Sequence, residues 1–181
     1  MRDPAAQSCN FESVYAALRA QARLYLRREQ NAYSLSPTAL VHEAWMAVAY
    51  SRSANVRDKV HYVRLLSRVM KNLLIDRARR KKALINGGGV QHIDWTDASV
   101  ACQDDCDLIL AVAASMERLA ARSPRLATLV ELRYFSGFTE SEVAQILGVT
   151  NRTVRRQWRV ARLRLLESLQ PERAAEVEAH E

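Results

Sequence analysis

The sequence contains few residues that bend or cross-link a chain: 5 glycines, 4 prolines and 3 cysteines among 181 residues. Scarce glycine and proline favour long helices over many turns, so we expect an all-α fold. The cysteines, Cys9, Cys102 and Cys106, are odd in number and irregularly spaced, which predicts free thiols rather than a disulfide framework. No second cysteine or histidine pair accompanies Cys102 and Cys106, so no metal site is expected and the role of the three cysteines is left open.

Long apolar runs are also missing. No stretch approaches the roughly 18 apolar residues of a membrane span, and the first residues lack the apolar run of a signal peptide. We therefore expect a cytoplasmic protein with no membrane partner. The four histidines are scattered, and neither a glycine-rich phosphate loop nor a paired carboxylate site is present. The sequence predicts no catalytic residue, no enzyme activity and no cofactor.

Positive charge is abundant and clustered. The formal net charge of +7 predicts a polyanionic partner. Residues 77–82 carry five cations, and six arginines crowd residues 152–164. Between these clusters, residues 83–116 contain no lysine or arginine but five aspartates. The charge along the chain is therefore basic, then acidic, then basic.

Helical periodicity marks the N-terminal half. Apolar spacing predicts a helix over about residues 10–30 with Asn10 as its N-cap. Ser36-Pro37 predicts the start of a second helix, because serine caps exposed amides and proline is tolerated at the first helical position. A third helix, over about residues 58–82, has an apolar stripe and a row of cations on its other side. An ordinary solvated face is the alternative interpretation of those cations.

The C-terminal half predicts a linker followed by a helix-turn-helix. Residues 87–106 begin with three glycines and show no helical period; the pattern resumes at Asp107, and the helix that Ser123-Pro124 opens ends at Gly137. Thr139 and Glu142 fit a capping box, in which each side chain satisfies a backbone amide of the other. Gly148 then allows the left-handed turn between two short helices.

The last predicted helix, from about Asn151, separates apolar and basic faces. At 100° per residue, Trp158, Ala161 and Leu165 fall within about 40° of Val154. Four arginines fall between about 100° and 200°, on the opposite side. Such a face is typical of a recognition helix in the major groove, and a merely solvated helix is the alternative. The predicted reading face comprises Asn151, Arg152, Arg155, Arg156 and Arg159.

Three segments in this order resemble an extracytoplasmic-function (ECF) sigma factor of RNA polymerase. Residues 40–45 (LVHEAW) are similar to the helix that docks on the polymerase clamp, and residues 61–80 to the promoter-melting helix of the sigma-two domain. Residues 136–149 and 152–155 are similar to the sigma-four domain. The resemblance covers nearly the whole chain.

The resemblance implies two small helical domains joined by a flexible acidic linker. A sigma-two domain would span residues 8–83, a linker 84–106, a sigma-four domain 107–171 and a tail 172–181. The implied partners are promoter DNA and core RNA polymerase, through its β′ clamp and β flap. The implied clamp-docking residues are Leu40, Val41 and Glu43. The implied minus-ten surface comprises Arg64, Arg68, Lys71, Asn72, Arg79 and Arg80.

Asn72 matches the family position that helps to hold a flipped base, which requires an amide that both donates and accepts. The alternative is that Asn72 is an ordinary polar residue on a helix.

The chain departs from the family before the docking motif, where an acidic cluster is replaced by Ser36-Pro37-Thr38-Ala39. We hypothesise that a Ser/Thr protein kinase restores the charge by phosphorylating Thr38. The alternative is that Thr38 is an ordinary first-turn residue and other contacts compensate.

Two other classes of protein share some of these features. A helix-turn-helix regulator that does not require core polymerase would bind DNA, but it leaves the basic helix of residues 58–82 unexplained. A nucleic-acid chaperone explains the charge but not the capped recognition helix.

Overall fold

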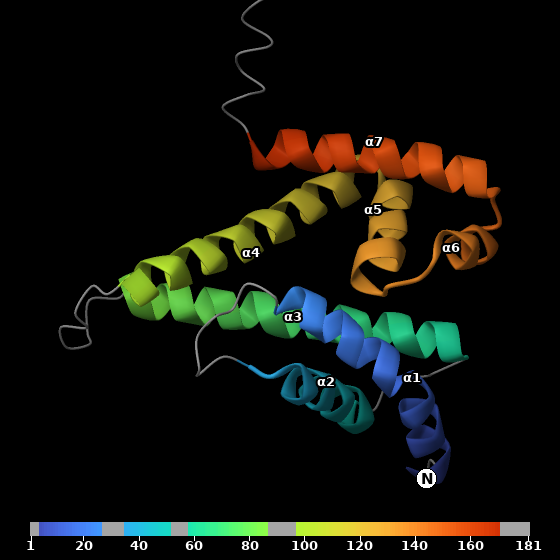
Figure 1. The fold of residues 1–181 in the computed structure, drawn as a ribbon, viewed down its shortest axis with the longest axis horizontal. Coiled ribbons are helices and arrows are strands. Elements are labelled where there is room, and N and C mark those ends of the chain that lie inside the picture. Colours follow the sequence, from blue (N-terminus) through green and yellow to red (C-terminus); the bar gives the residue numbers. More distant parts are fainter. Residues whose placement is uncertain (1–3, 27–34, 52–57, 87–96, 171–181) are drawn as a thin grey trace, which may run out of the picture. The chain divides into compact units, whose positions relative to one another are not determined.

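The computed structural model describes residues 4–26, 35–51, 58–86 and 97–170, with side chains for residues 14–26, 35–51, 58–84 and 106–170. Over these ranges the chain forms helices and no strand (Figure 1). The all-α fold class is thereby confirmed. The chain divides into two compact units, which are described separately: Met1–Asp107 with Phe135–Gly137, and Leu108–Tyr134 with Phe138–Glu181.

Helix α1 (Pro4–Tyr25) starts earlier than the sequence predicted. Asn10 lies inside this helix, so its assignment as the N-cap is wrong. Proline is tolerated in the first turn of a helix and alanine has the highest helix propensity, so Pro4 and the two alanines after it extend the helix. The predicted end, near residue 30, lies outside the described residues.

The predicted start of α2 (Pro37–Tyr50) is confirmed. The Ser36 Oγ accepts a hydrogen bond from the Ala39 amide at 3.1 Å, and Pro37 occupies the first turn. Helix α3 (Lys59–Asn86) begins beside Asp58, whose Oδ1 accepts the His61 amide at 2.7 Å. Each of these helices therefore has a side chain that satisfies an amide left open at its N-terminus.

Apolar stripes of α1, α2 and α3 form the core of the first unit. The largest side chains in it are fully buried, with less than 2% exposure, and include Leu18, Leu40, Val41, Leu66 and Met70. Burial of such side chains is the main favourable term in folding. The three helices are thus held together by one shared core, and their outer faces are left to carry charge.

Helix α4 (Asp97–Arg122) changes the predicted linker. The sequence predicted a linker over residues 84–106, yet α3 continues to Asn86 and α4 already begins at Asp97. Residues 87–96 lie outside the described residues. Acidic side chains are favoured near a helix N-terminus by the helix dipole, so an acidic segment without apolar periodicity still starts a helix. In the first unit, the Lys82 Nζ lies 2.6 Å from the Asp107 Oδ1.

The second unit contains α5 (Pro124–Val130), the π-helical turn (Glu131–Phe135) as far as Tyr134, α6 (Glu140–Leu147) and α7 (Asn151–Leu169), together with α4 from Leu108 on. The predicted stop at Gly137 is confirmed, since this residue has a left-handed φ of 72°. The Phe138 amide donates to the Leu132 carbonyl at 3.0 Å and closes the turn. The π-helical turn was not predicted, because its wider hydrogen-bond spacing leaves no mark on apolar periodicity.

A core cluster of the second unit is formed by α5, the π-helical turn, α6 and α7. Its buried members are Leu129, Leu132, Val143, Ala144 and Val154, and half-buried Phe138 and Trp158 pack against them. On α7 the core residues Val154 and Trp158 lie on one face of the helix. The core therefore fixes the rotation of α7 about its own axis.

Ser67 supplies a stability test. Its hydroxyl is buried on α3 and has no hydrogen-bond partner among the described residues. Replacing it in Ser67→Ala should raise the free energy of unfolding of the first unit by about 1–2 kcal/mol, because an unsatisfied buried hydroxyl is destabilising. Native-state hydrogen exchange of the α3 amides measures this change.

Ser115 is the matched control, since it is equally buried but its Oγ bonds to the Arg118 Nη2 at 3.1 Å. Ser115→Ala should destabilise the second unit by about 1 kcal/mol. An equal loss of stability in Ser67→Ala would mean that the Ser67 hydroxyl has a partner after all.

Candidate nucleic-acid interface

The helix-turn-helix is formed by α6 and α7 as predicted. The Thr139 Oγ1 accepts the Glu142 amide at 3.3 Å, and the Glu142 carboxylate accepts the Thr139 amide at 2.7 Å. The Thr139 hydroxyl also donates to the Glu142 Oε2 at 2.6 Å, and this hydrogen bond, together with that of the Thr139 amide, lowers the pKa of Glu142 below its usual value. Gly148 ends α6 with φ 63° and ψ 39°, and the Thr150 side chain then caps α7. The capping box, the glycine turn and the start of α7 are all confirmed.

Helix α7 is anchored at both ends. Val154 and Ala161 are buried, and Trp158 is half-buried with the Arg133 guanidinium 5.6 Å from its ring centroid. Near the C-terminus of α7, the Arg118 Nε donates to the Ser168 Oγ at 2.7 Å. These contacts confirm the predicted packing stripe and leave the opposite side of the helix facing solvent.

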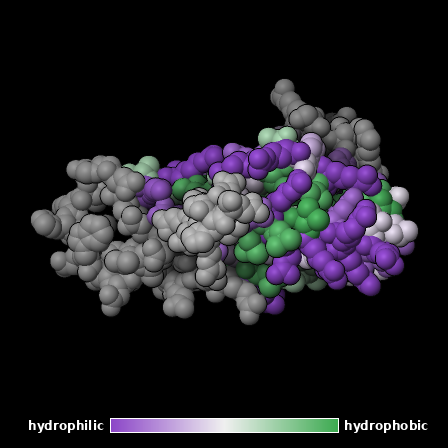
Figure 2. Space-filling model, turned by 90° about the horizontal axis from the view of Figure 1, so that it is seen from above, coloured by the Kyte–Doolittle hydropathy of each residue, from purple (hydrophilic) through white to green (hydrophobic). Residues whose placement is uncertain are grey.

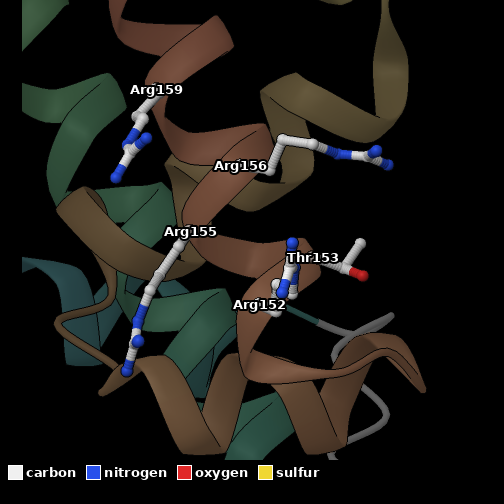
Figure 3. Close-up of a pocket in the computed structure, with 5 residues that line it drawn as sticks. All are labelled: Arg152, Thr153, Arg155, Arg156 and Arg159. Carbon is white, nitrogen blue, oxygen red and sulfur yellow. The ribbon is translucent and has the colours of Figure 1, made fainter.

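That solvent side carries the predicted reading face. Arg152, Arg155, Arg156 and Arg159 are exposed and, with Thr153, line one hollow (Figure 3). Figure 3 shows Arg155 and Arg159 extending to the same side of α7, while Arg156 extends to the other side. A hollow lined by four arginines suits an anionic backbone with base edges between its phosphates.

Two polar contacts join the first turn of α6 to α7. The Arg155 Nε lies 2.6 Å from the Glu140 Oε1, and the Asn151 Nδ2 donates to the Ser141 Oγ at 3.3 Å. Sequence reasoning missed Glu140. Nothing in the sequence links the two residues of this ion pair, because they meet only through the packing of α6 against α7.

Most of the predicted minus-ten residues lie on one side of α3. Arg64, Arg68, Asn72 and Arg79 are exposed, and at 100° per residue they fall within about 80° of one another. Lys71 lies about 20° outside this arc, beside Arg64, and is half-buried. Arg80 lies about 80° further round the helix, where its Nε donates to the Asp76 carbonyl at 3.4 Å. Helix α3 thus groups five of the six residues and sets Arg80 apart.

The predicted clamp-docking set needs a correction. Leu40 and Val41 have 0% exposure and belong to the core of the first unit, so their side chains are not available to a partner. They pack inward because residues 40, 41, 44 and 48 form the buried stripe of α2. Glu43 is exposed on the opposite side, and on that side Met46 and Tyr50 are also exposed. Thr38 is partly exposed in the first turn of α2.

The rest of the described surface offers no site of another kind. Among the described residues, no group of three histidine, cysteine or acidic side chains is placed to hold a metal ion, and Cys106 is a buried thiol. No described helix is long and apolar enough to cross a membrane. On the face drawn in Figure 2, the coloured residues are mostly hydrophilic, with an apolar area among them. On α7, the exposed apolar side chains are Val160, Leu163 and Leu166.

A family model described as "ECF sigma factor" matches residues 2–171, which include all the elements described above. No curated protein and no solved structure matches the chain.

Proposed function

The chain belongs to the ECF sigma factor family, and we propose that its two units divide promoter recognition between them. Members of this family are alternative sigma factors, which bind core RNA polymerase and promoter DNA, and the family is not one of enzymes. In our proposal the first unit acts as a sigma-two domain, on the minus-ten element and the β′ clamp. The second unit acts as a sigma-four domain, on the minus-thirty-five element and the β flap.

The observation that carries this proposal is the division of α7 into two faces. Val154 and Ala161 hold the helix in the core, while four arginines face solvent on the other side. Like charges on one face repel each other unless an anion lies nearby. The reading face that we propose is Asn151, Arg152, Arg155, Arg156 and Arg159.

Helix α3 supports the second part of the proposal. Its exposed arc combines cations that attract the DNA backbone with the amide of Asn72, which both donates and accepts hydrogen bonds. We assign Arg64, Arg68, Lys71, Asn72 and Arg79 to the minus-ten region. Arg80 is assigned to its border, since it lies further round the helix.

Docking on polymerase is the step that we propose to be regulated. The first turn of α2 contains no acidic residue, where the family has an acidic cluster that meets basic residues of the clamp. With Leu40 and Val41 buried, Glu43 is the one acidic side chain on the exposed side of α2. An unmodified chain therefore has little negative charge for a basic clamp.

Thr38 is the residue best placed to supply that charge. A phosphate adds about −1.5 to −2 charge, and the helix dipole favours negative charge in a first turn. The Ser36 hydroxyl is already engaged as the cap of α2, whereas Thr38 follows it and is partly exposed. We propose that a Ser/Thr protein kinase activates this sigma factor by phosphorylating Thr38.

Run-off transcription with core polymerase on genomic fragments tests the reading face. Alanine variants of Arg152, Arg155, Arg156 and Arg159 should each lower transcription from the fragments that the unaltered chain selects. A variant that loses a bidentate base contact should weaken binding by about 1–3 kcal/mol and relax one base preference, whereas loss of a phosphate contact weakens binding to all sequences alike. Normal transcription by all four variants would contradict the assignment.

A pre-melted promoter tests Asn72. Asn72→Ala should slow open-complex formation on duplex DNA with little change in polymerase binding, because the flipped base loses its amide partner. A template with an unpaired minus-ten bubble should restore transcription. If the bubble gives no rescue, Asn72 does not act in melting. Arg80→Ala, at the border of the arc, is the matched control and should respond less.

Substitution at Thr38 tests the kinase proposal. Thr38→Glu should bind core polymerase more tightly than the unphosphorylated chain, and Thr38→Ala should stay inactive in cells under the inducing condition. Ser36→Asn is the control, because asparagine keeps the N-cap but removes the neighbouring hydroxyl. Mass spectrometry of protein from induced cells locates the phosphate. Full activity of Thr38→Ala, with no phosphate on residues 34–38, would exclude this regulation.

A further inference from the structure

The ion pair between Glu140 and Arg155 connects a residue outside the recognition helix to one of its reading arginines. We propose that Glu140 is a positioning residue that fixes the Arg155 guanidinium for guanine recognition and thereby sets base preference. The inference rests on the proposed function of α7 as the reading helix. It adds a residue that does not itself touch the base.

The atoms in the pair support this role. The Glu140 Oε1 forms an ion pair with the Arg155 Nε at 2.6 Å and accepts no hydrogen bond among the described residues. The Nε atom is the inner edge of the guanidinium. The two terminal nitrogens, Nη1 and Nη2, lie at the other end of the group. A guanidinium that approaches a guanine end-on uses these two nitrogens to donate to O6 and N7. The Glu140 carboxylate therefore contacts the Nε edge of Arg155, which a guanidinium that binds a base end-on does not use.

The exposed fractions of the two side chains also support a positioning role for Glu140. The Arg155 side chain is 67% exposed, whereas that of Glu140 is 25% exposed. The carboxylate thus lies nearer to the protein, in the first turn of α6, where the helix dipole favours negative charge. The guanidinium lies on the solvent side of the pair, where a groove of DNA would reach it.

Arg155 has a carboxylate partner, unlike the other arginines of the reading face. Among the described residues, no carboxylate forms an ion pair with Arg152, Arg156 or Arg159. A long arginine side chain loses considerable rotamer freedom when it is fixed, and a partner that restricts it beforehand reduces that loss on binding. The hydrogen bond from Asn151 to Ser141 holds the same two helices together beside the pair.

The pair also limits non-specific binding. An unpaired arginine on this face is attracted to any phosphate, and phosphate contacts strengthen binding to every sequence alike. The Glu140 carboxylate neutralises one such cation and repels phosphates that approach it. Loss of this carboxylate should therefore have opposite effects on two quantities, lowering base discrimination and increasing the salt-dependent attraction to the backbone.

Selection from randomised DNA tests the proposal. Holoenzyme assembled from core polymerase and the full chain is incubated with duplexes randomised over the upstream element, and the bound DNA is sequenced. The unaltered chain should select a guanine that Arg155→Ala no longer selects, with a loss of roughly tenfold to hundredfold in preference. Glu140→Gln should lose about threefold to tenfold at that same position while the preferences at other positions stay unchanged. Its binding to the selected promoter should also become more salt-dependent, with a slope steeper by about one.

Two further variants separate positioning from other effects. Glu142→Gln removes a negative charge from the same turn without touching Arg155 and keeps an acceptor for the capping box, so its base preferences should match those of the unaltered chain. Glu140→Gln added to Arg155→Ala should cause no further change in preference, because Glu140 acts through Arg155.

The other possible results distinguish a failure of the proposed reading role of Arg155 from a failure of the proposed positioning role of Glu140. If Arg155→Ala changes no base preference, the assignment of Arg155 as a reading residue fails. If Arg155→Ala loses a guanine but Glu140→Gln does not, the positioning role alone is wrong. A cytosine preference that disappears in Glu140→Gln regardless of Arg155 would also overturn it, since Glu140 would then read a base directly.

Discussion

The burial of one narrow apolar stripe on α7 is the constraint on which the second unit depends. Val154 and Ala161 are the buried residues of this helix, and Val154 packs with Leu129, Leu132 and Val143. Apolar burial is non-directional, but a stripe at helical spacing makes it directional, because only one rotation of the helix satisfies it. The cap at Thr139 and the turn at Gly148 then set where α7 begins. The arginines face solvent as a result of this packing.

Much of the fold could be predicted from local sequence patterns. The cap at Ser36, the capping box at Thr139 and the left-handed Gly148 each depend on a few adjacent residues, so their chemistry is visible without the tertiary structure. The stripe on α7 follows from periodicity alone. By contrast, α4 begins at Asp97 within an acidic segment that has no apolar period, and the Glu140–Arg155 pair depends on how two helices pack. The spacing of residues in the sequence carries no information about where a helix without an apolar period begins or about which residues of two packed helices meet.

The residues that carry the resemblance to the docking helix have two different physical roles, since some are buried in the core and others face outward. Residues 40–45 identify the helix, yet Leu40 and Val41 support it from inside while Glu43 faces outward. A resemblance alone does not say which motif residues point inward. The periodicity of α2 does, since its buried residues repeat at helical spacing. The outward side combines one carboxylate with apolar Met46 and Tyr50, a weakly charged surface for the helix that we propose to meet a basic partner.

The position of Glu140 outside α7 has an evolutionary meaning. If the orientation of Arg155 is set from a neighbouring helix, the promoters that the protein recognises can diverge through substitutions in α6 while every residue of α7 stays the same. Two sigma factors with identical recognition helices would then control different genes. Comparison of the recognition helix alone would group them together, whereas the residue opposite Arg155 would separate them.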